Sequence, residues 1–168
     1  MPPIPPRILL LMGVAGSGKT TIGRLLATEL GWPYFEADDF HSPANKDKMS
    51  RGIPLNDADR APWLAALRAQ IDACLATGRS AVFTCSALKE KYRQILMAAT
   101  APDAVTLVYL AADRATIQAR IDQRQGHYMK ADMVQSQFEA LEIPTHALTL
   151  DTRQPPEALV AKIRQAFP

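Results

Sequence analysis

The stretch that decides the fold is Gly13-Val14-Ala15-Gly16-Ser17-Gly18-Lys19-Thr20, which follows an apolar run at 8–12. It matches the phosphate-binding pattern G-x-x-x-x-G-K-[ST], and a helical pattern over 18–30 follows it, as that pattern requires. Glycines let successive backbone N–H groups face phosphate oxygens, and the N-terminus of a helix adds a favourable field. Lys19 can reach the β- and γ-phosphates, and the Thr20 hydroxyl can ligate Mg²⁺. The stretch therefore predicts a nucleoside triphosphate site rather than a glycine-rich turn without a ligand.

Strand-length apolar runs and helical patterns alternate along the whole chain. Strands are expected at 8–12, 34–37, 81–85, 105–110 and 147–150. Helices are expected at 18–30, 58–76, 88–99, 113–125, 132–141 and 155–167. Such alternation is typical of a parallel sheet with helices on both faces. We predict an α/β fold with a five-stranded parallel sheet in a single domain over 1–168.

The composition limits the class of protein. The chain has 168 residues, 48% of them hydrophobic, and a formal net charge of +2, which suits one globular domain and excludes a disordered chain. No apolar run is long enough to span a membrane, and the N-terminal sequence lacks the pattern of a signal peptide. Two cysteines, Cys74 and Cys85, are too few for a disulfide scaffold or a metal framework. We expect a reduced cytoplasmic protein that binds neither nucleic acid nor membrane.

Other classes of triphosphate-binding protein lack their defining residues. A GTPase would need Asn-Lys-x-Asp late in the chain, but Asn45–Lys48 ends in Lys and follows the second strand. A motor ATPase would need acidic residues at the end of a strand, whereas Asp113 is placed to cap a helix. The small size and a basic segment suited to a lid favour phosphoryl transfer to a small acceptor.

An acidic segment follows the second expected strand. Glu36, Asp38, Asp39 and His41 would lie at the carboxyl edge of the sheet, where open α/β sheets bind ligands. They can hold hydroxyls, accept a proton or support Mg²⁺ through water, although a solvated acidic loop is an equal alternative. Cations that would suit an acidic acceptor follow along the chain: Lys48, Arg51, Arg60, Lys89 and Arg93.

Two arginines mark a candidate lid at about 120–132. Arg120 and Arg124 lie at i and i+4, hence on one face of a helix. Arg124 could swing against the phosphates and Arg120 could stack on adenine, the alternative being surface arginines favoured by the helix dipole.

Several longer strings resemble the motifs of gluconate kinases, in order and over nearly the whole chain. They are the string over 36–45, Lys48-Met49, the string over 52–57, Asp59-Arg60-Ala61-Pro62-Trp63-Leu64, Cys85-Ser86-Ala87-Leu88-Lys89, Tyr92-Arg93 and the string over 124–129. The resemblance implies a three-layer P-loop kinase fold with a mobile lid, related more distantly to shikimate and adenylate kinases. It implies ATP-dependent phosphorylation of D-gluconate at the 6-hydroxyl with Mg²⁺, and a possible homodimer.

The resemblance also implies roles for single residues, with a phosphate loop at 13–20 and an acceptor-binding insert at about 38–78. Lys19, Asp38 and Arg124 would be catalytic, Asp38 orienting or deprotonating the hydroxyl. The nucleotide would be bound by Gly13, Ala15, Gly16, Ser17, Gly18, Lys19, Thr20, Thr21, Arg120 and Arg124. The acceptor would be bound by Asp38, His41, Lys48, Arg51, Arg60, Lys89 and Arg93. Mg²⁺ would be held by Thr20 and, through water, by Glu36. The string Glu36-Ala37-Asp38 takes the place of the Asp-Gly-Asp that is usual in the family. The loop over 151–155 resembles the one that lines adenine in related kinases.

Two alternatives stay open at this stage. Another small acidic polyol, such as shikimate, could be the acceptor, although Ser86-Ala87-Leu88 replaces the Gly-Gly-Gly turn of shikimate kinases. A sensor that binds ATP without turnover would also need the phosphate loop.

Overall fold

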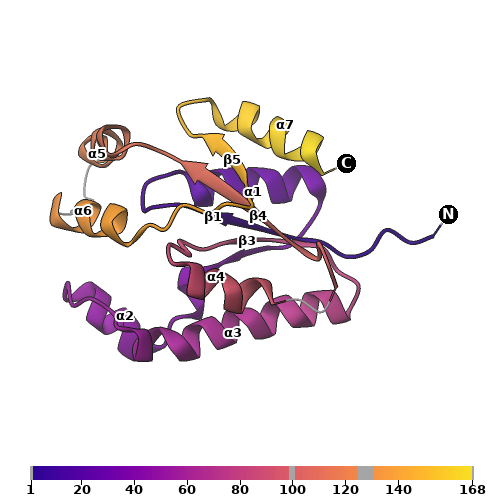
Figure 1. Cartoon of the computed structure of the whole chain (residues 1–168), viewed down its shortest axis with the longest axis horizontal. Coiled ribbons are helices and arrows are strands. Elements are labelled where there is room, and N and C mark those ends of the chain that lie inside the picture. The colour runs from indigo at the N-terminus through magenta and orange to yellow at the C-terminus, as the bar shows by residue number, and fades with distance from the viewer. Residues whose placement is uncertain (1, 99–100, 125–130, 168) are drawn as a thin grey trace.

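A five-stranded parallel sheet forms the centre of the molecule (Figure 1). The computed structural model describes residues 2–98, 101–124 and 131–167. The strands are β1 (Ile8–Met12), β2 (Tyr34–Glu36), β3 (Ala81–Thr84), β4 (Val105–Ala111) and β5 (Leu148–Asp151). They pair in parallel in the order β2-β3-β1-β4-β5. This confirms the predicted α/β fold and all five predicted strands, whose ends agree with the prediction to within one residue.

Helices cover both faces of this sheet (Figure 1). In chain order they are α1 (Lys19–Leu30), a short 3-10 helix η1 (Ala37–Phe40), α2 (Pro43–Ser50), α3 (Asp57–Ala76), α4 (Glu90–Met97), α5 (Arg114–Gln123), α6 (Ala131–Ala140) and α7 (Pro156–Ala166). α1 and α7 pack on one face, and α3 and α4 on the other. Among the described helices, none is both long and apolar enough to cross a bilayer.

The central strand β1 shows why the layers form. All five of its residues are buried, since helices cover both sides of a parallel sheet. Ile8, Leu10 and Met12 belong to the core under α3 and α4. Leu9 and Leu11 belong to the core under α1 and α7, as the two-residue period of a strand requires.

Local signals set most helix ends. Asp113 accepts from Thr116 N–H at 2.7 Å, which confirms its predicted role as an N-cap, and Asn56 caps α3 by accepting from Asp59 N–H at 2.8 Å. The helix α2 was not predicted, because its residues are polar on every side and lack an apolar period. Its start has a sequence signal nonetheless: Ser42 caps it and Pro43 is its first residue.

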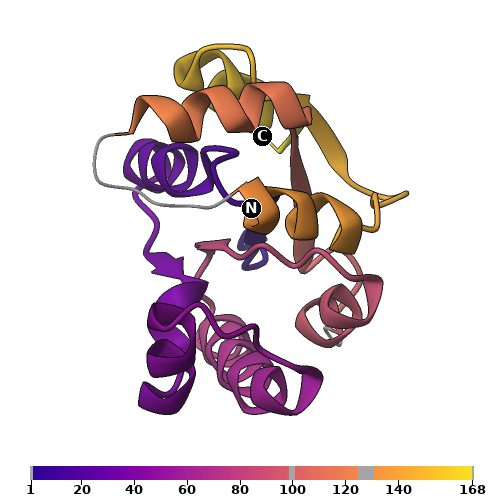
Figure 2. The ribbon, with the colours of Figure 1, turned by 90° about the vertical axis from the view of Figure 1, so that its left-hand side faces the viewer.

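The elements that carry function gather where the strands end. Figure 2 looks at that end of the sheet, with α5 and α6 on one side and α2 and the start of α3 on the other. A third apolar cluster holds α5 and α6 against the loops at this end of the sheet. In it, Val14 after β1 packs with Leu88 after β3, with Ile117 and Ile121 of α5 and with Val134 of α6.

Candidate active site

The loop between β1 and α1 has a backbone that needs glycine. Gly16 and Gly18 have φ angles of 82° and 97°, in the left-handed region that residues with a Cβ rarely adopt. At Gly13 a Cβ would lie 2.5 Å from Ser17 Oγ and 2.9 Å from the Leu110 carbonyl oxygen. The loop therefore wraps tightly over the N-terminus of α1.

The second half of this loop presents free donors. Ala15 N–H donates to Gln137 Oε1 at 3.0 Å, and Ser17 N–H donates to the Val14 carbonyl at 3.1 Å. No described residue accepts from the N–H groups over 18–21 or from Gly16 N–H. Ser17 Oγ is buried and also lacks a partner within the described part of the chain. Such a set of unsatisfied donors at a helix N-terminus fits the phosphates of a nucleotide.

Lys19 is held inside the loop. Its Nζ donates to the carbonyl oxygens of Gly13 at 3.0 Å and Val14 at 3.1 Å. Burial lowers the pKa of Lys19, while the negative charges of Asp38 and Glu36 act in the opposite direction. The ammonium group therefore lies within electrostatic reach of both carboxylates.

The two residues predicted to hold Mg²⁺ are in contact. Glu36 Oε2 accepts from Thr20 Oγ1 at 2.8 Å and from Tyr34 OH at 2.5 Å, and Tyr34 OH also pairs with Thr84 Oγ1 at 2.8 Å. Burial and the hydrogen bond to Glu36 raise the pKa of Tyr34 to about 12, so this phenol stays protonated and donates to the carboxylate. A hydroxyl and a carboxylate are oxygen ligands of the kind that Mg²⁺ takes. Within the described residues no group of three or more His, Cys, Asp or Glu side chains gathers as a metal site. A magnesium ion here would therefore take most of its ligands from phosphate and water.

His41 forms the wall of the acceptor side. Its ring stacks on Trp63 at 4.3 Å between centroids with an interplanar angle of 12°, and its Nδ1 lies 3.3 Å from Asn45 Nδ2. Trp63 Nε1 in turn donates to the Ala37 carbonyl at 2.7 Å, which fixes the indole under η1. Burial lowers the pKa of His41, so the imidazole is neutral near pH 7.

Asp38 is an exposed carboxylate in η1, directly after β2. Its negative charge acts on the pKa of both His41 and Lys19. Arg60 acts on the pKa of His41 with the opposite sign. Asp38 is thus near enough to His41 and to Lys19 for its charge to influence both.

Two predicted cations meet at one tyrosine. The Arg60 guanidinium lies 5.6 Å from the Tyr92 ring centroid, and Lys89 Nζ lies 6.0 Å from it. Arg60 Nη1 also donates to Tyr92 OH at 3.3 Å, and Tyr92 OH donates to Asp57 Oδ1 at 2.7 Å. Hydrogen bonds from Lys91 and Tyr92 lower the pKa of Asp57 to about 2, so it stays ionised. No described carboxylate forms an ion pair with Arg60 or Lys89, which leaves both positive charges available to an anion.

The other three predicted acceptor-side cations have structural contacts. Lys48 Nζ donates to both carboxylate oxygens of Asp59, at 2.9 and 3.0 Å, and so ties α2 to the start of α3. Arg51 Nη1 donates to Asp47 Oδ2 at 3.2 Å on the solvent side of α2. Neither contact supports the predicted role of these two residues in acceptor binding.

Arg93 is buried, and its contacts with the protein do not support its predicted role in acceptor binding. Its Nη1 donates to the carbonyls of Ala87 at 2.8 Å and Leu88 at 3.0 Å. Its Nη2 donates to the Glu142 carbonyl at 2.8 Å and to Glu90 Oε2 at 2.9 Å, and its Nε donates to Glu90 Oε2 at 3.2 Å. All five N–H groups are used, so no donor remains for a substrate.

Arg120 joins the phosphate loop to the loop after β5. Its Nη1 lies 3.4 Å from the Gly16 carbonyl oxygen, 3.5 Å from that of Ser17 and 3.3 Å from Thr152 Oγ1, and its Nη2 donates to the Thr152 carbonyl. Arg124 ends α5 and is exposed. The part of the predicted lid at 125–130 lies outside the described residues.

Four residues of the site, Tyr34, Asn45, Tyr92 and Gln137, were not among the predicted site residues. Tyr34 and Glu36 are two apart on one strand, and this spacing alone puts them on one face. Asn45 and Tyr92 occur in the motif strings, but a string does not say which side chain supports which. Gln137 has no sequence signal beyond its place in an expected helix.

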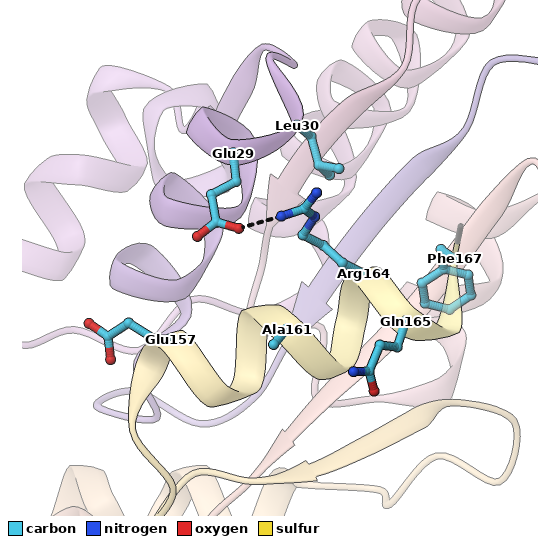
Figure 3. A pocket seen from close by; sticks show the side chains of 7 residues that line it. All are labelled: Glu29, Leu30, Glu157, Ala161, Arg164, Gln165 and Phe167. Atoms are coloured by element: carbon cyan, nitrogen blue, oxygen red, sulfur yellow. Dashed lines mark hydrogen bonds and ion pairs between the residues drawn. The ribbon is translucent and has the colours of Figure 1, made fainter.

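A surface groove between α1 and α7 lies away from this site (Figure 3). Its lining residues are Glu29, Leu30, Glu157, Ala161, Arg164, Gln165 and Phe167. Glu29 accepts from Arg164 Nη1 at 3.0 Å and lies ten residues after Lys19, roughly 15 Å along α1. No predicted site residue lines the groove, so we place the candidate chemistry at the loops after β1, β2 and β3.

Comparison with known proteins places these loops in a family. A family described as an AAA domain matches residues 8–143. A gluconokinase from Gluconobacter oxydans is 45% identical over 139 residues, which cover 83% of this chain and 77% of that protein. The unliganded crystal structure of a sugar kinase from Janibacter is 44% identical, with a TM-score of 0.86 over 96% of this chain and 94% of that one. The structure of a gluconokinase from Sinorhizobium meliloti is 36% identical, with a TM-score of 0.82 over 98% of this chain and 97% of that one.

Proposed function

This chain belongs to the gluconokinase family of P-loop kinases, and we propose that it transfers the γ-phosphoryl group of ATP to the 6-hydroxyl of D-gluconate. The products are 6-phospho-D-gluconate and ADP. The observation that carries the proposal is the contact of Glu36 with Thr20 of the phosphate loop at 2.8 Å, which brings the acidic segment of Glu36 and Asp38 to the side of the loop. A sensor would need the loop, but it would not need a carboxylate beside it.

The transfer needs little covalent chemistry from the protein. The 6-hydroxyl oxygen forms a bond to the γ-phosphorus while the bond from that phosphorus to the oxygen bridging to the β-phosphate breaks, and ADP leaves. The hydroxyl proton passes to Asp38 or is held by it as the bond forms. Lys19, fixed by two carbonyl contacts, supplies a positive charge that needs no rearrangement when the transferred oxygens gain charge.

Magnesium fits the residues at the start of α1. Thr20 and, through water, Glu36 would hold the ion, which would neutralise charge on the phosphate oxygens. Tyr34 helps Thr20 to keep Glu36 in place, since both donate to the same carboxylate oxygen. Arg120 and Arg124 complete the proposed nucleotide contacts, Arg120 from between the phosphate loop and the loop after β5.

The gluconate carboxylate is assigned to Arg60 and Lys89. Both converge on the Tyr92 ring, and neither is neutralised by a described ion pair. His41 is neutral and rigidly stacked, so it can exchange hydrogen bonds with the polyol hydroxyls without adding charge. The acceptor would then lie between these groups and Asp38.

Two further expectations belong to this proposal. The free thiols of Cys74 and Cys85 are buried, and burial raises the pKa of Cys85 to about 12, as suits an unreactive thiol in the reducing cytoplasm. A homodimer is inferred from the family resemblance, and sedimentation at several protein concentrations tests it.

An acceptor panel tests the function. ADP release from Mg·ATP is measured with gluconate, shikimate, AMP, glucose and no acceptor, and release only with gluconate is expected. The variant Asp38→Asn is expected to lose about 10²- to 10⁴-fold in turnover, the range for a general base, while its calorimetric affinity for ATP is kept. Equal release without acceptor, or unchanged turnover in Asp38→Asn, would contradict the proposal.

A further inference from the structure

One phosphate-loop donor is taken by a residue from a distant helix. Gln137 of α6 accepts from Ala15 N–H at 3.0 Å, across 122 positions of sequence. The contact has a packed base, because Val134 of α6 and Val14 belong to the same buried cluster. The side chain of Gln137 is half-buried, so this hydrogen bond is partly shielded from water.

The same segment is anchored at its other end to the acceptor side. Glu142, just after α6, donates its N–H to the Leu88 carbonyl at 2.8 Å and accepts from Glu90 N–H at 2.7 Å through Oε2. Its carbonyl accepts from Arg93 Nη2 at 2.8 Å. Leu88 and Glu90 are the two neighbours of Lys89, so Glu142 fixes the backbone on both sides of that lysine.

Ala15 does not present its N–H to a nucleotide in this arrangement. The unpaired N–H donors are those of Gly16 and of residues 18–21, whereas Ala15 N–H donates to Gln137 at a normal hydrogen-bond distance. This contact gives no support to the prediction that Ala15 binds the nucleotide. The first half of the loop is fastened to α6, and the second half is left for phosphate.

We propose that Gln137 is a positioning residue that sets the phosphate loop against the acceptor-side loop, with Glu142 as the second anchor. The proposal rests on the proposed function, because it assigns Lys89 to the gluconate carboxylate. When the Gln137 contact is lost, α6 is free to shift from Ala15, and the shift reaches Lys89 through Glu142. Gluconate binding then weakens, although Gln137 itself touches neither substrate.

Steady-state kinetics of three variants test this. Gln137→Leu removes the acceptor, and Gln137→Glu keeps an oxygen at the same reach. Gln135→Leu is the matched control, because Gln135 lies on the same helix but is exposed and contacts Arg114 and Glu139 instead. Gln137→Leu is expected to raise the KM for gluconate about five-fold, the loss typical of one neutral hydrogen bond, with the Kd for ATP unchanged within about two-fold. The assays are run at saturating Mg·ATP, so that repulsion between the new carboxylate and phosphate does not affect the comparison. Under these conditions Gln137→Glu is expected to have the wild-type KM for gluconate, and so is Gln135→Leu.

The outcomes separate this inference from the proposed function. Wild-type protein without gluconate-dependent ADP release would overturn the function itself. Active wild-type protein with an unchanged KM in Gln137→Leu would overturn only the role of Gln137, even if the melting temperature fell. Tighter ATP binding by Gln137→Leu would also overturn it, since Gln137 would then compete with phosphate for Ala15 N–H.

Discussion

Replacing Arg93 by methionine distinguishes a structural arginine from a substrate ligand. The change removes five donated hydrogen bonds. The Leu88 carbonyl keeps one donor, because Glu142 N–H also donates to it. The carbonyls of Ala87 and Glu142 have no other donor among the described residues, so each loses its hydrogen bond. Glu90 is exposed and returns to water at little cost.

The magnitude follows mainly from the Ala87 carbonyl, because Glu142 is exposed and its carbonyl can return to water. A buried carbonyl left without a partner costs about 1–3 kcal/mol, so Arg93→Met is expected to lose about 2 kcal/mol of unfolding free energy. For a chain of this length each kcal/mol lowers the melting temperature by about 2–4 °C, which gives a fall of roughly 4–8 °C. Part of the effect falls on Ala87, whose φ of 45° is a strained conformation for a residue with a Cβ and is held by the Arg93 contact.

Urea and thermal unfolding, read beside the KM for gluconate, check this prediction. The matched control is Arg164→Met, which breaks a half-exposed ion pair with Glu29 and is expected to cost about 0.5 kcal/mol or less. Full stability of Arg93→Met together with a raised KM for gluconate would refute the structural assignment and return Arg93 to the acceptor site.

Three further changes address the site. Glu36→Gln weakens the hold on a water-bridged Mg²⁺ ion beside Thr20, so the free Mg²⁺ needed for half-maximal rate should rise about 10- to 100-fold; an unchanged Mg²⁺ requirement would count against this site. Lys89→Met removes one charge-assisted contact, so the KM for gluconate should rise at least about 10-fold while the Kd for ATP stays constant; an equal change in both constants would contradict the assignment. Folding lowers the pKa of His41 below its unfolded value of 6.5, so the unfolded chain binds a proton at a higher pH than the folded one. The unfolding free energy should therefore fall as the pH drops below about 6.5. Urea titrations should show a weaker pH dependence in His41→Gln, and equal slopes in the two proteins would exclude His41 as the cause.

The fold was predictable because its signals are local or periodic. β1 is apolar at every position, as both covered faces require, and the caps at Asn56 and Asp113 follow from side chains that bond within three residues. α2 escaped prediction because it has no apolar face, so periodicity has nothing to detect there. Its stability comes from the cap at Ser42 and from tertiary contacts such as Lys48 with Asp59.

The site was predictable only in part, because a residue type gives a charge but not its partner. Thr20 lies at the start of α1, after β1, and Glu36 ends β2. The carboxyl ends of parallel strands share one edge of the sheet, so the topology brings the two residues to that same edge. Arg93 could not be assigned in this way. Its acceptors come from the loop before α4 and from Glu142, 49 positions away, and no sequence pattern links them.

The five acceptor-side cations divide according to what surrounds each charge. Arg93 is desolvated, so its charge is tolerated only with every N–H satisfied, and it has nothing left to offer a ligand. Lys48 and Arg51 are partly exposed, yet a carboxylate already neutralises each of them. Arg60 and Lys89 face an aromatic ring, which attracts a cation without neutralising it, and the ring keeps two long side chains together while their charges stay available. A site for a sugar acid needs this last combination, because the carboxylate must find positive charge that no protein anion has taken. Loss of Tyr92 as Tyr92→Leu should therefore raise the KM for gluconate through Arg60 and Lys89 together, and a double variant with Lys89→Met should show less than the sum of the two effects.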